Sequence, residues 1–545
     1  MTDGLSPAAL HERLRRAMAE GRELALLDVR EELCFGRDGH LLFAVNLPLS
    51  RLELRIADMV PRRDTPLITI DGGDDETLAS RAAARLRQLG YSAVECLAGG
   101  VNGWADAGFE VFDDVNVPIK GFAAATVAQN DTPRIAPADL GRRLTAGETF
   151  VLLDSRPVNE FRAGALPGAI VCPGPDLLRR FKDVVPDDKT PVVVNCMTRT
   201  RGLLGAQTLI DAGVPNPVYG LDGGTWGWRL AGYDLQAGSQ NLPPRLSAQA
   251  RHHAAAAAER LAEQFSIPRL SREQVSELRA DRRRTTYLLD VRSRQEYREG
   301  HIPGSISAPG TELVMSPFQH VATLNARLVL ADNDGTRALV TAMWLKRMGW
   351  FDVAVLSDGF KGRQLAIGDF VPTVLGLGQT RCRTVTAGVL RRAMARGRVQ
   401  VVDMATSGQY AAGHIPGAWF SIRSRPEALL QALPEQPATV VLTSPGGLVA
   451  RFAAAELNRL TDRPVIVLHG GTAAWRQSGG MLETGASHMT TPADDVWHRR
   501  GISVDGMQAY LDWEAGVLEQ IRKDGTAPYL TAPAALQPAA TLAAG

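Results

Sequence analysis

The sequence has little cysteine, few aromatic residues and almost no net charge. Its 545 residues include five cysteines and 6% aromatic residues, and 60 Lys and Arg face 59 Asp and Glu, for a formal net charge of +1. None of the cysteines forms a C-x-x-C pair, which argues against a disulfide framework or a zinc site. The balanced charge lacks the broad basic footprint that nucleic-acid-binding proteins carry, so we expect no nucleic-acid partner.

Long apolar runs are also missing. No run reaches the roughly 18 residues of a membrane-spanning helix, and the charged first 24 residues lack the apolar core of a signal peptide. We therefore expect a cytoplasmic protein without a membrane partner. A hydrophobic fraction of 45% is typical of a globular chain, and the length predicts about three to five domains.

What the sequence does contain is a fourfold repeat. Each copy opens with a short apolar strand pattern that ends in aspartate, at Asp28, Asp154, Asp290 and Asp403. Each copy closes with a second strand pattern and a glycine turn, at Gly100, Gly224, Gly359 and Gly471. Because the two landmarks keep nearly the same spacing, we interpret the copies as four related domains rather than as small solenoid repeats.

Strand and helix patterns alternate within a copy. In the second copy, Pro191–Asn195 is a continuous apolar run, residues 202–213 have helical spacing, and Asn216–Leu221 is again strand-like. Continuous apolar strands separated by helices are typical of a parallel sheet that is covered on both faces. The predicted fold class is α/β, with four tandem domains that each hold a small parallel sheet flanked by helices.

The predicted domain limits follow from these landmarks. The four domains span residues 1–120, 132–240, 267–376 and 380–485. We expect a helical linker at residues 246–265, which are rich in alanine, and a linker without clear periodicity near residues 113–131. Residues 486–545 form a C-terminal segment with an amphipathic helix over Asp505–Lys523 and a disordered Ala- and Pro-rich end from Ala532. The spacing further predicts that copy one packs with copy two, and copy three with copy four.

The second copy has a chemically distinctive loop after its Pro191–Asn195 strand. It reads Cys196-Met-Thr-Arg-Thr-Arg201, with a helix pattern starting about six residues after the cysteine. Inward-pointing backbone N–H groups, the helix N-terminus and the guanidinium groups of Arg199 and Arg201 would all favour the thiolate, so we expect a lowered thiol pKa. The same loop would hold an oxyanion beside the sulfur. Cys96 and Cys172 lie in strand patterns and are expected to be core residues, whereas Cys34 and Cys382 show no supporting pattern.

These motifs resemble those of the rhodanese-like superfamily in a tandem four-domain form. The resemblance is carried by residues 152–161, 164–170, 196–201 and 221–228 of copy two and by residues 288–306 of copy three. It implies that Cys196 is the catalytic nucleophile and that the loop binds the substrate. The substrate-binding residues that it implies are Arg199, Arg201, Met197, Thr198 and Thr200.

The other three copies lack cysteine at this position. Alignment places Asp71, Asp332 and Ser444 there, and copy three keeps Arg337 at the place of Arg201. We expect these three domains to be inactive, although one of their pockets could bind a different ligand. Asp154 and Arg156 are interpreted as a structural ion pair, because equivalents follow the first strand in copies one and three. His301 and His414 are also interpreted as structural.

The resemblance also implies a reaction. A Cys-x4-Arg loop favours sulfur transfer over the phosphatase chemistry of the longer Cys-x5-Arg form. The expected reaction moves sulfane sulfur from thiosulfate or a similar donor through a Cys196 persulfide to cyanide or a thiol, without a metal or organic cofactor. A persulfide relay that serves a protein acceptor and a 3-mercaptopyruvate sulfurtransferase remain as alternatives, as does a pure binding protein.

Overall fold

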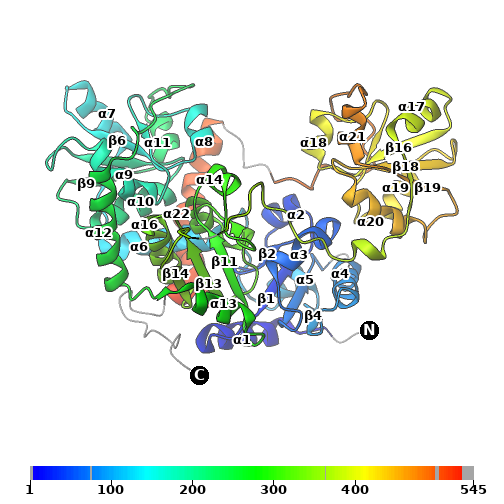
Figure 1. The fold of residues 1–545 in the computed structure, drawn as a ribbon, viewed down its shortest axis with the longest axis horizontal. Helices are drawn as coiled ribbons and strands as arrows, with labels where there is room; N and C mark the ends of the chain where they lie inside the picture. The colour runs from blue at the N-terminus through cyan, green and yellow to red at the C-terminus, as the bar shows by residue number, and fades with distance from the viewer. Residues whose placement is uncertain (1–3, 74–75, 363, 498–502, 531–545) are drawn as a thin grey trace.

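The chain folds into four α/β units in sequence order. The computed structural model describes residues 4–73, 76–362, 364–497 and 503–530, so the predicted disordered end from Ala532 lies outside the described residues. In Figure 1 the fourth unit stands apart at the upper right, whereas the first three lie together. The predicted fold class is confirmed. The limits of the domains stay predictions.

The first two units illustrate the common topology. The first has a four-stranded sheet of order β2-β1-β3-β4 and the second a five-stranded sheet of order β5-β9-β8-β6-β7, with all neighbouring strands parallel. The strands are β1 (Ala25–Asp28), β2 (Val45–Asn46), β3 (Leu67–Ile70), β4 (Val94–Cys96), β5 (Arg134–Ile135), β6 (Val151–Asp154), β7 (Ile170–Val171), β8 (Val192–Asn195) and β9 (Val218–Leu221). The helices are α1 (Pro7–Glu20), α2 (Glu32–Arg37), α3 (Leu52–Met59), α4 (Glu76–Gln88), α5 (Gly100–Asp106), α7 (Pro137–Thr145), α8 (Val158–Ala163), α9 (Asp176–Val184), α10 (Thr200–Asp211) and α11 (Gly224–Leu230).

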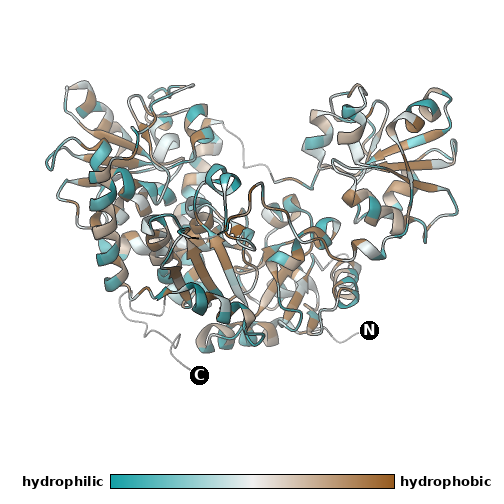
Figure 2. Cartoon of the chain, in the orientation of Figure 1, coloured by the Kyte–Doolittle hydropathy of each residue, from teal (hydrophilic) through white to brown (hydrophobic). Residues whose placement is uncertain are grey.

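The last two units repeat this plan with sheet orders β10-β14-β13-β11-β12 and β15-β19-β18-β16-β17. Their strands are β10 (Arg269–Leu270), β11 (Thr286–Asp290), β12 (Ile306–Ser307), β13 (Arg327–Ala331), β14 (Val353–Leu356), β15 (Arg383–Val385), β16 (Val399–Asp403), β17 (Trp419–Phe420), β18 (Thr439–Thr443) and β19 (Val465–Leu468). Their helices are α13 (Arg272–Ala280), α14 (Arg294–Glu299), α15 (Gly310–Met315), α16 (Thr336–Arg347), α17 (Ala387–Ala395), α18 (Ser407–Ala412), α19 (Pro426–Ala432), α20 (Leu448–Leu457) and α21 (Gly471–Gln477). Figure 2 shows the apolar strands inside the layers and the hydrophilic residues on the outer helices.

Three further helices connect or cover the units. The alanine-rich linker is α12 (Ala248–Gln264), as expected, and the C-terminal helix is α22 (Val504–Asp524). α22 begins where the Ser503 hydroxyl accepts the N–H of Gly506 and ends at Gly525, whose φ of 69° suits glycine. The linker near residues 113–131 contains α6 (Val117–Asn130), a helix that the sequence analysis did not identify. α6 is buried on most of its surface, so its apolar residues leave no periodic pattern.

The expected pairing of the units is wrong. The third unit packs against both the first and the second: the Asn325 amide donates to the Ala17 carbonyl at 2.8 Å, and the Trp344 indole donates to the Thr208 hydroxyl at 2.9 Å. The fourth unit contacts the first, where the guanidinium of Arg423 lies 2.6 Å from the carboxylate of Glu53. The third unit is therefore central to the assembly, and the fourth unit contacts the first, which is not its neighbour in sequence.

The hydrophobic cores separate the fourth unit from the other three. One continuous core takes residues from the first three units and from α6, α12 and α22, with Leu10, Phe122, Leu261, Trp344 and Ile521 among its members. The fourth unit has two clusters of its own on the two faces of its sheet. In the part of the chain that the structure describes, no helix is long and apolar enough to cross a bilayer.

This division predicts the behaviour of fragments. A fragment of residues 380–497 should fold alone, because its two clusters are nearly self-contained. A fragment of residues 1–245 should aggregate, because removal of α12, α16 and α22 exposes its share of the common core. Circular dichroism and sedimentation of both fragments measure this. A monomeric 1–245 fragment with a cooperative thermal transition would contradict the shared core.

Candidate functional site

The candidate site is the loop between β8 and α10. All four residues of β8 are buried, and Cys196 follows directly at the carboxyl end of this central strand. α10 begins at Thr200, four residues after the cysteine and two earlier than expected. The backbone N–H groups of Thr198 and Gly202 point at the sulfur of Cys196 and favour its thiolate. The backbone donors of the loop therefore converge on the sulfur, as the sequence predicts.

A glycine of the closing turn holds this loop in place. Gly224 has a φ of 56°, and a Cβ atom there would lie 2.5 Å from the carbonyl oxygens of Cys196 and Thr198. The next residue, Thr225, donates its N–H to the Cys196 carbonyl at 2.8 Å. Gly100, Gly359 and Gly471 approach the equivalent loops in the same way. The glycine landmark is thus explained by a close backbone contact that leaves no room for a side chain.

The expected lowering of the thiol pKa is wrong. Cys196 is only 2% exposed, and this burial raises its pKa above the ordinary value. Arg201 and the loop N–H groups act in the opposite direction, but the buried carboxylate of Glu514 adds to the rise. The groups that lower the pKa are adjacent in sequence, whereas the burial of the thiol and the nearby acid come from distant parts of the chain.

The other cysteines lie outside this site. Cys172 is buried in the core, as expected, and burial raises its pKa. Cys96 is only partly buried. Burial raises the pKa of Cys34 to about 11, with a smaller contribution from Asp494.

The two loop arginines have different surroundings. Arg201 is held by Glu160 of α8, with N–O distances of 2.9 and 2.7 Å, and it lies close enough to favour the Cys196 thiolate. Arg199 faces away along the loop: its Nε donates to Asp222 at 3.3 Å and its Nη1 donates to the carbonyl of Leu511 at 3.0 Å. Arg201 is therefore among the leading influences on the thiol, whereas Arg199 contacts Asp222 and Leu511.

The C-terminal helix covers the loop. The hydroxyls of Thr198 and Thr200 donate to one carboxylate oxygen of Glu514, at 3.3 and 3.1 Å. Glu514 is 4% exposed, burial raises its pKa, and its second oxygen has no hydrogen-bond partner among the described residues. Around this carboxylate α22 packs an apolar cluster against the loop, made of Trp226, Met507, Tyr510, Met197 and Trp513.

The structure thus gathers the predicted site residues around one loop and adds α22 to them. Met197 lies in the apolar cluster, and its carbonyl accepts the N–H of Trp226 at 3.0 Å. Glu514 was missed, although the sequence carries a signal for it. It is an acid within the mostly apolar buried stripe of the helix, four residues after Tyr510 and three before Val517.

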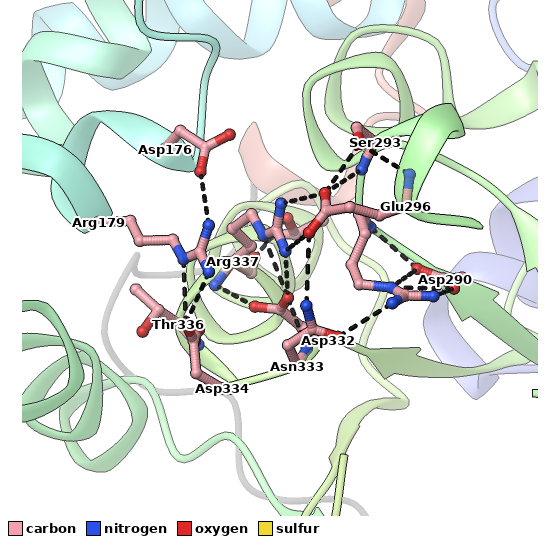
Figure 3. A network of polar contacts seen from close by, with 12 residues as sticks. Asp176, Arg179, Asp290, Ser293, Glu296, Asp332, Asn333, Asp334, Thr336 and Arg337 are labelled. Atoms are coloured by element: carbon pink, nitrogen blue, oxygen red, sulfur yellow. Dashed lines mark hydrogen bonds and ion pairs between the residues drawn. The ribbon is translucent and has the colours of Figure 1, made fainter. Parts of the chain in front are cut away.

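The equivalent loops of the other units hold an oxygen where Cys196 holds sulfur. In the third unit, the carboxylate of Asp332 accepts the N–H groups of Asn333 and Arg337 at 2.7 and 2.9 Å. The Arg337 side chain then bridges Asp332 and Glu296, in the arrangement that Figure 3 shows. Glu296 therefore holds Arg337 as Glu160 holds Arg201.

The first and fourth units fill their loops in a related way. The Asp71 carboxylate accepts the N–H groups of Gly73 and Ala79 at 3.1 and 2.9 Å. The Ser444 hydroxyl accepts the N–H of Ala450 at 3.3 Å. In the loops of Asp71 and Asp332, the carboxylate accepts the backbone N–H groups that an external anion would need as hydrogen-bond donors.

The interpretation of two other motifs is confirmed. Arg156 and Asp154 form a buried ion pair at 2.7 Å beneath the loop. The Nδ1 atoms of His301 and His414 lie 2.9 and 2.8 Å from the carbonyls of Tyr297 and Tyr410, and each ring stacks on that tyrosine. These groups hold local structure together.

Comparison with known proteins agrees with this geometry. The family model of the rhodanese-like domain matches residues 10–107, 136–231, 271–365 and 386–478. The chain belongs to the rhodanese-like family. The crystal structure of a thiosulfate sulfurtransferase from Pseudomonas aeruginosa matches it with a TM-score of 0.91 and 41% identity, over 96% of this chain and 98% of that one. An HTH-type transcriptional regulator from Mycobacterium tuberculosis is 27% identical over 227 residues, which are 42% of this chain and 90% of the regulator. The similarity to this thiosulfate sulfurtransferase thus spans nearly the whole chain.

The contacts of Glu514 give a prediction for this rhodanese site. Glu514→Gln should lower the pKa of Cys196, because the amide keeps an acceptor for the two threonines but removes a negative charge near the thiolate. The pH dependence of Cys196 alkylation by iodoacetamide, followed by mass spectrometry, measures the pKa.

The matched control is Glu519→Gln, on the exposed side of the same helix. It should leave the alkylation profile unchanged. An unchanged or raised pKa in Glu514→Gln would contradict the electrostatic role of the carboxylate.

Proposed function

We propose that this protein is a thiosulfate sulfurtransferase that carries sulfane sulfur on Cys196. The observation that carries the proposal is the loop itself: Cys196 lies among the N–H groups of Thr198 and Gly202 with Arg201 alongside. The near full-length similarity to a thiosulfate sulfurtransferase supports the same chemistry. A reducing cytoplasm, which we also propose, would keep such a thiol available.

The reaction divides into two sulfur transfers. The Cys196 thiolate attacks the outer sulfur of thiosulfate, an S–S bond to the cysteine forms, and the S–S bond of the donor breaks with its electron pair leaving on sulfite. Cyanide or a thiolate then attacks the outer sulfur of the persulfide and regenerates the Cys196 thiolate. No electrons enter or leave the protein, so the chemistry needs no redox cofactor.

The surroundings of the thiol give each group a role. Loop N–H groups and Arg201 stabilise the thiolate and then the terminal sulfur of the persulfide. Arg201 also offers the N–H donors that Glu160 does not occupy to the sulfonate oxygens of the donor, with its orientation fixed by Glu160. Because Cys196 is 2% exposed, the donor reaches the sulfur only when the side chains that α22 lays over the loop move aside.

The other three units take no part in sulfur transfer under this proposal. Asp71, Asp332 and Ser444 offer no thiol, and the two carboxylates occupy their own loop donors. They would repel an anionic donor as well. We therefore propose one catalytic domain supported by three structural ones.

The burial of Cys196 favours a second candidate function, that of a persulfide relay. A persulfide beneath α22 would be shielded from small thiols, and a protein acceptor could gain access by displacing the helix. The two candidates differ in turnover. An enzyme transfers sulfur rapidly to cyanide, whereas a relay accumulates a persulfide that small acceptors discharge slowly. Single-turnover kinetics of the isolated persulfide form distinguish them.

The single-site proposal gives a direct mutational prediction. Cys196→Ser should abolish both thiosulfate-to-cyanide sulfur transfer and the mass increase of one sulfur atom after thiosulfate treatment. Cys34→Ser and Cys382→Ser, as controls outside the loop, should retain both. Full activity in Cys196→Ser would refute the proposal.

Arg201 gives a prediction about donor binding. Arg201→Ala should cost about 2–4 kcal/mol in kcat/KM for thiosulfate, the scale of a lost charge-assisted donor, and Arg201→Lys should recover part of it. Steady-state assays with thiosulfate measure the cost, and alkylation of Cys196 by neutral iodoacetamide separates donor binding from thiol activation. Equal losses in both assays would mean that Arg201 acts on the thiol pKa alone.

A further inference from the structure

A recurring ion pair is missing its cation in the fourth unit. In the first three units, an arginine two residues after the strand aspartate folds back onto the carboxylate: Arg30 on Asp28 at 2.6 Å, Arg156 on Asp154 at 2.7 Å and Arg292 on Asp290 at 2.7 Å. Each guanidinium also donates to a glycine carbonyl at 2.6 Å, that of Gly39, Gly164 or Gly300. Three copies thus show the same two-acceptor site for a guanidinium.

The fourth unit keeps the aspartate and lacks the arginine. Asp403 is 1% exposed, and the residue two positions later is Ala405. The Ala405 N–H donates to the Asp403 carboxylate at 2.9 Å, as the arginine N–H does in the other units. The Thr472 hydroxyl donates at 3.2 Å, and burial raises the pKa of Asp403. The Asp403 carboxylate therefore accepts hydrogen bonds from neutral donors, whereas its counterparts in the first three units pair with an arginine.

A cavity lies beside this carboxylate. Its volume is about 200 Å³, and Asp403, Ala405, Gln409, Gly413 and Arg476 are among its lining residues. Gly413 is the counterpart of the three carbonyl-bearing glycines, because it ends α18 with a φ of 169° as Gly164 and Gly300 end their helices. The fourth unit thus has a space, in place of the arginine side chain, that is bordered by the counterparts of both residues that receive a guanidinium in the other units.

We propose that this cavity binds a guanidinium group, either of a small guanidino compound or of an arginine side chain from another molecule. The planar fork matches a carboxylate through two parallel N–H donors, and the group stays charged at every physiological pH. A neutral group of the same shape, such as urea, would leave the buried carboxylate without a counter-charge. The site goes beyond sulfur transfer and lies in a unit without a loop cysteine.

Other polar groups lie around the cavity. Arg476 of α21 is exposed at its edge and would repel a cation. The ring of buried His414 lies nearby, and its Nε2 is 3.8 Å from the carboxylate of Glu483. Arg476 is therefore the group whose removal should strengthen binding.

Isothermal titration calorimetry of the full chain with guanidinium chloride, with urea and NaCl as matched titrants, tests the proposal. Guanidinium should bind the wild-type chain with one-to-one stoichiometry and urea should not. Asp403→Asn and Ala405→Arg should each weaken binding by about tenfold or more, and Arg476→Ala should strengthen it. Methylguanidinium and N-acetylarginine amide distinguish a small guanidino compound from the arginine side chain of another molecule. The second binds only if the entrance of the cavity is wide enough for a peptide backbone.

Ala405→Arg also gives a readout that needs no ligand. It should raise the melting temperature of the fourth unit in the full chain, because the new guanidinium would reach Asp403 as in the other units. No guanidinium binding to the wild-type chain, equal binding of urea, or unchanged binding in Ala405→Arg would each overturn the proposal. A lowered melting temperature of this variant would overturn it as well, because the cavity would then not have the shape of the arginine site.

Discussion

Backbone N–H groups that converge on one side chain are the constraint on which this structure depends. Each central strand ends in a loop whose N–H groups point at the residue after the strand, and something must accept them. In the four units the acceptors are the sulfur of Cys196, the carboxylates of Asp71 and Asp332 and the hydroxyl of Ser444. The geometry is thus common to all four units. What differs is the acceptor, and with it the chemistry that each loop can support.

The loop geometry also explains which sequence landmarks survive in every copy. The glycine at each closing turn lies against the loop carbonyls, where a Cβ would collide. In three copies, the ion pair beneath the loop joins the first strand to the following glycine carbonyl. The glycine and the ion pair both recur at nearly constant spacing within each copy that has them, so they can be recognised from the sequence alone.

Local features could therefore be predicted from the sequence, and features that depend on distant partners could not. The apolar run before Cys196, the alanine-rich α12 and the amphipathic α22 carry their patterns in their own residues. α6 lacks a pattern because most of its surface is buried. The pairing of units depends on contacts such as Trp344 with Thr208, which no spacing records. The raised pKa of Cys196 has the same origin, because it comes first from burial and then from Glu514, which lies more than 300 positions further along the chain.

The position of α22 has a consequence for the biogenesis of the protein. Residues 503–530 follow all four sheets in the chain, yet they pack onto the loop of the second unit and onto α6. During synthesis from the N-terminus, the Cys196 loop therefore stays uncovered while the third and fourth units emerge from the ribosome. A nascent chain exposes the thiol to oxidants and to small sulfur donors, and a finished chain shields it. A product truncated anywhere before α22 would keep the loop sequence and lose its cover.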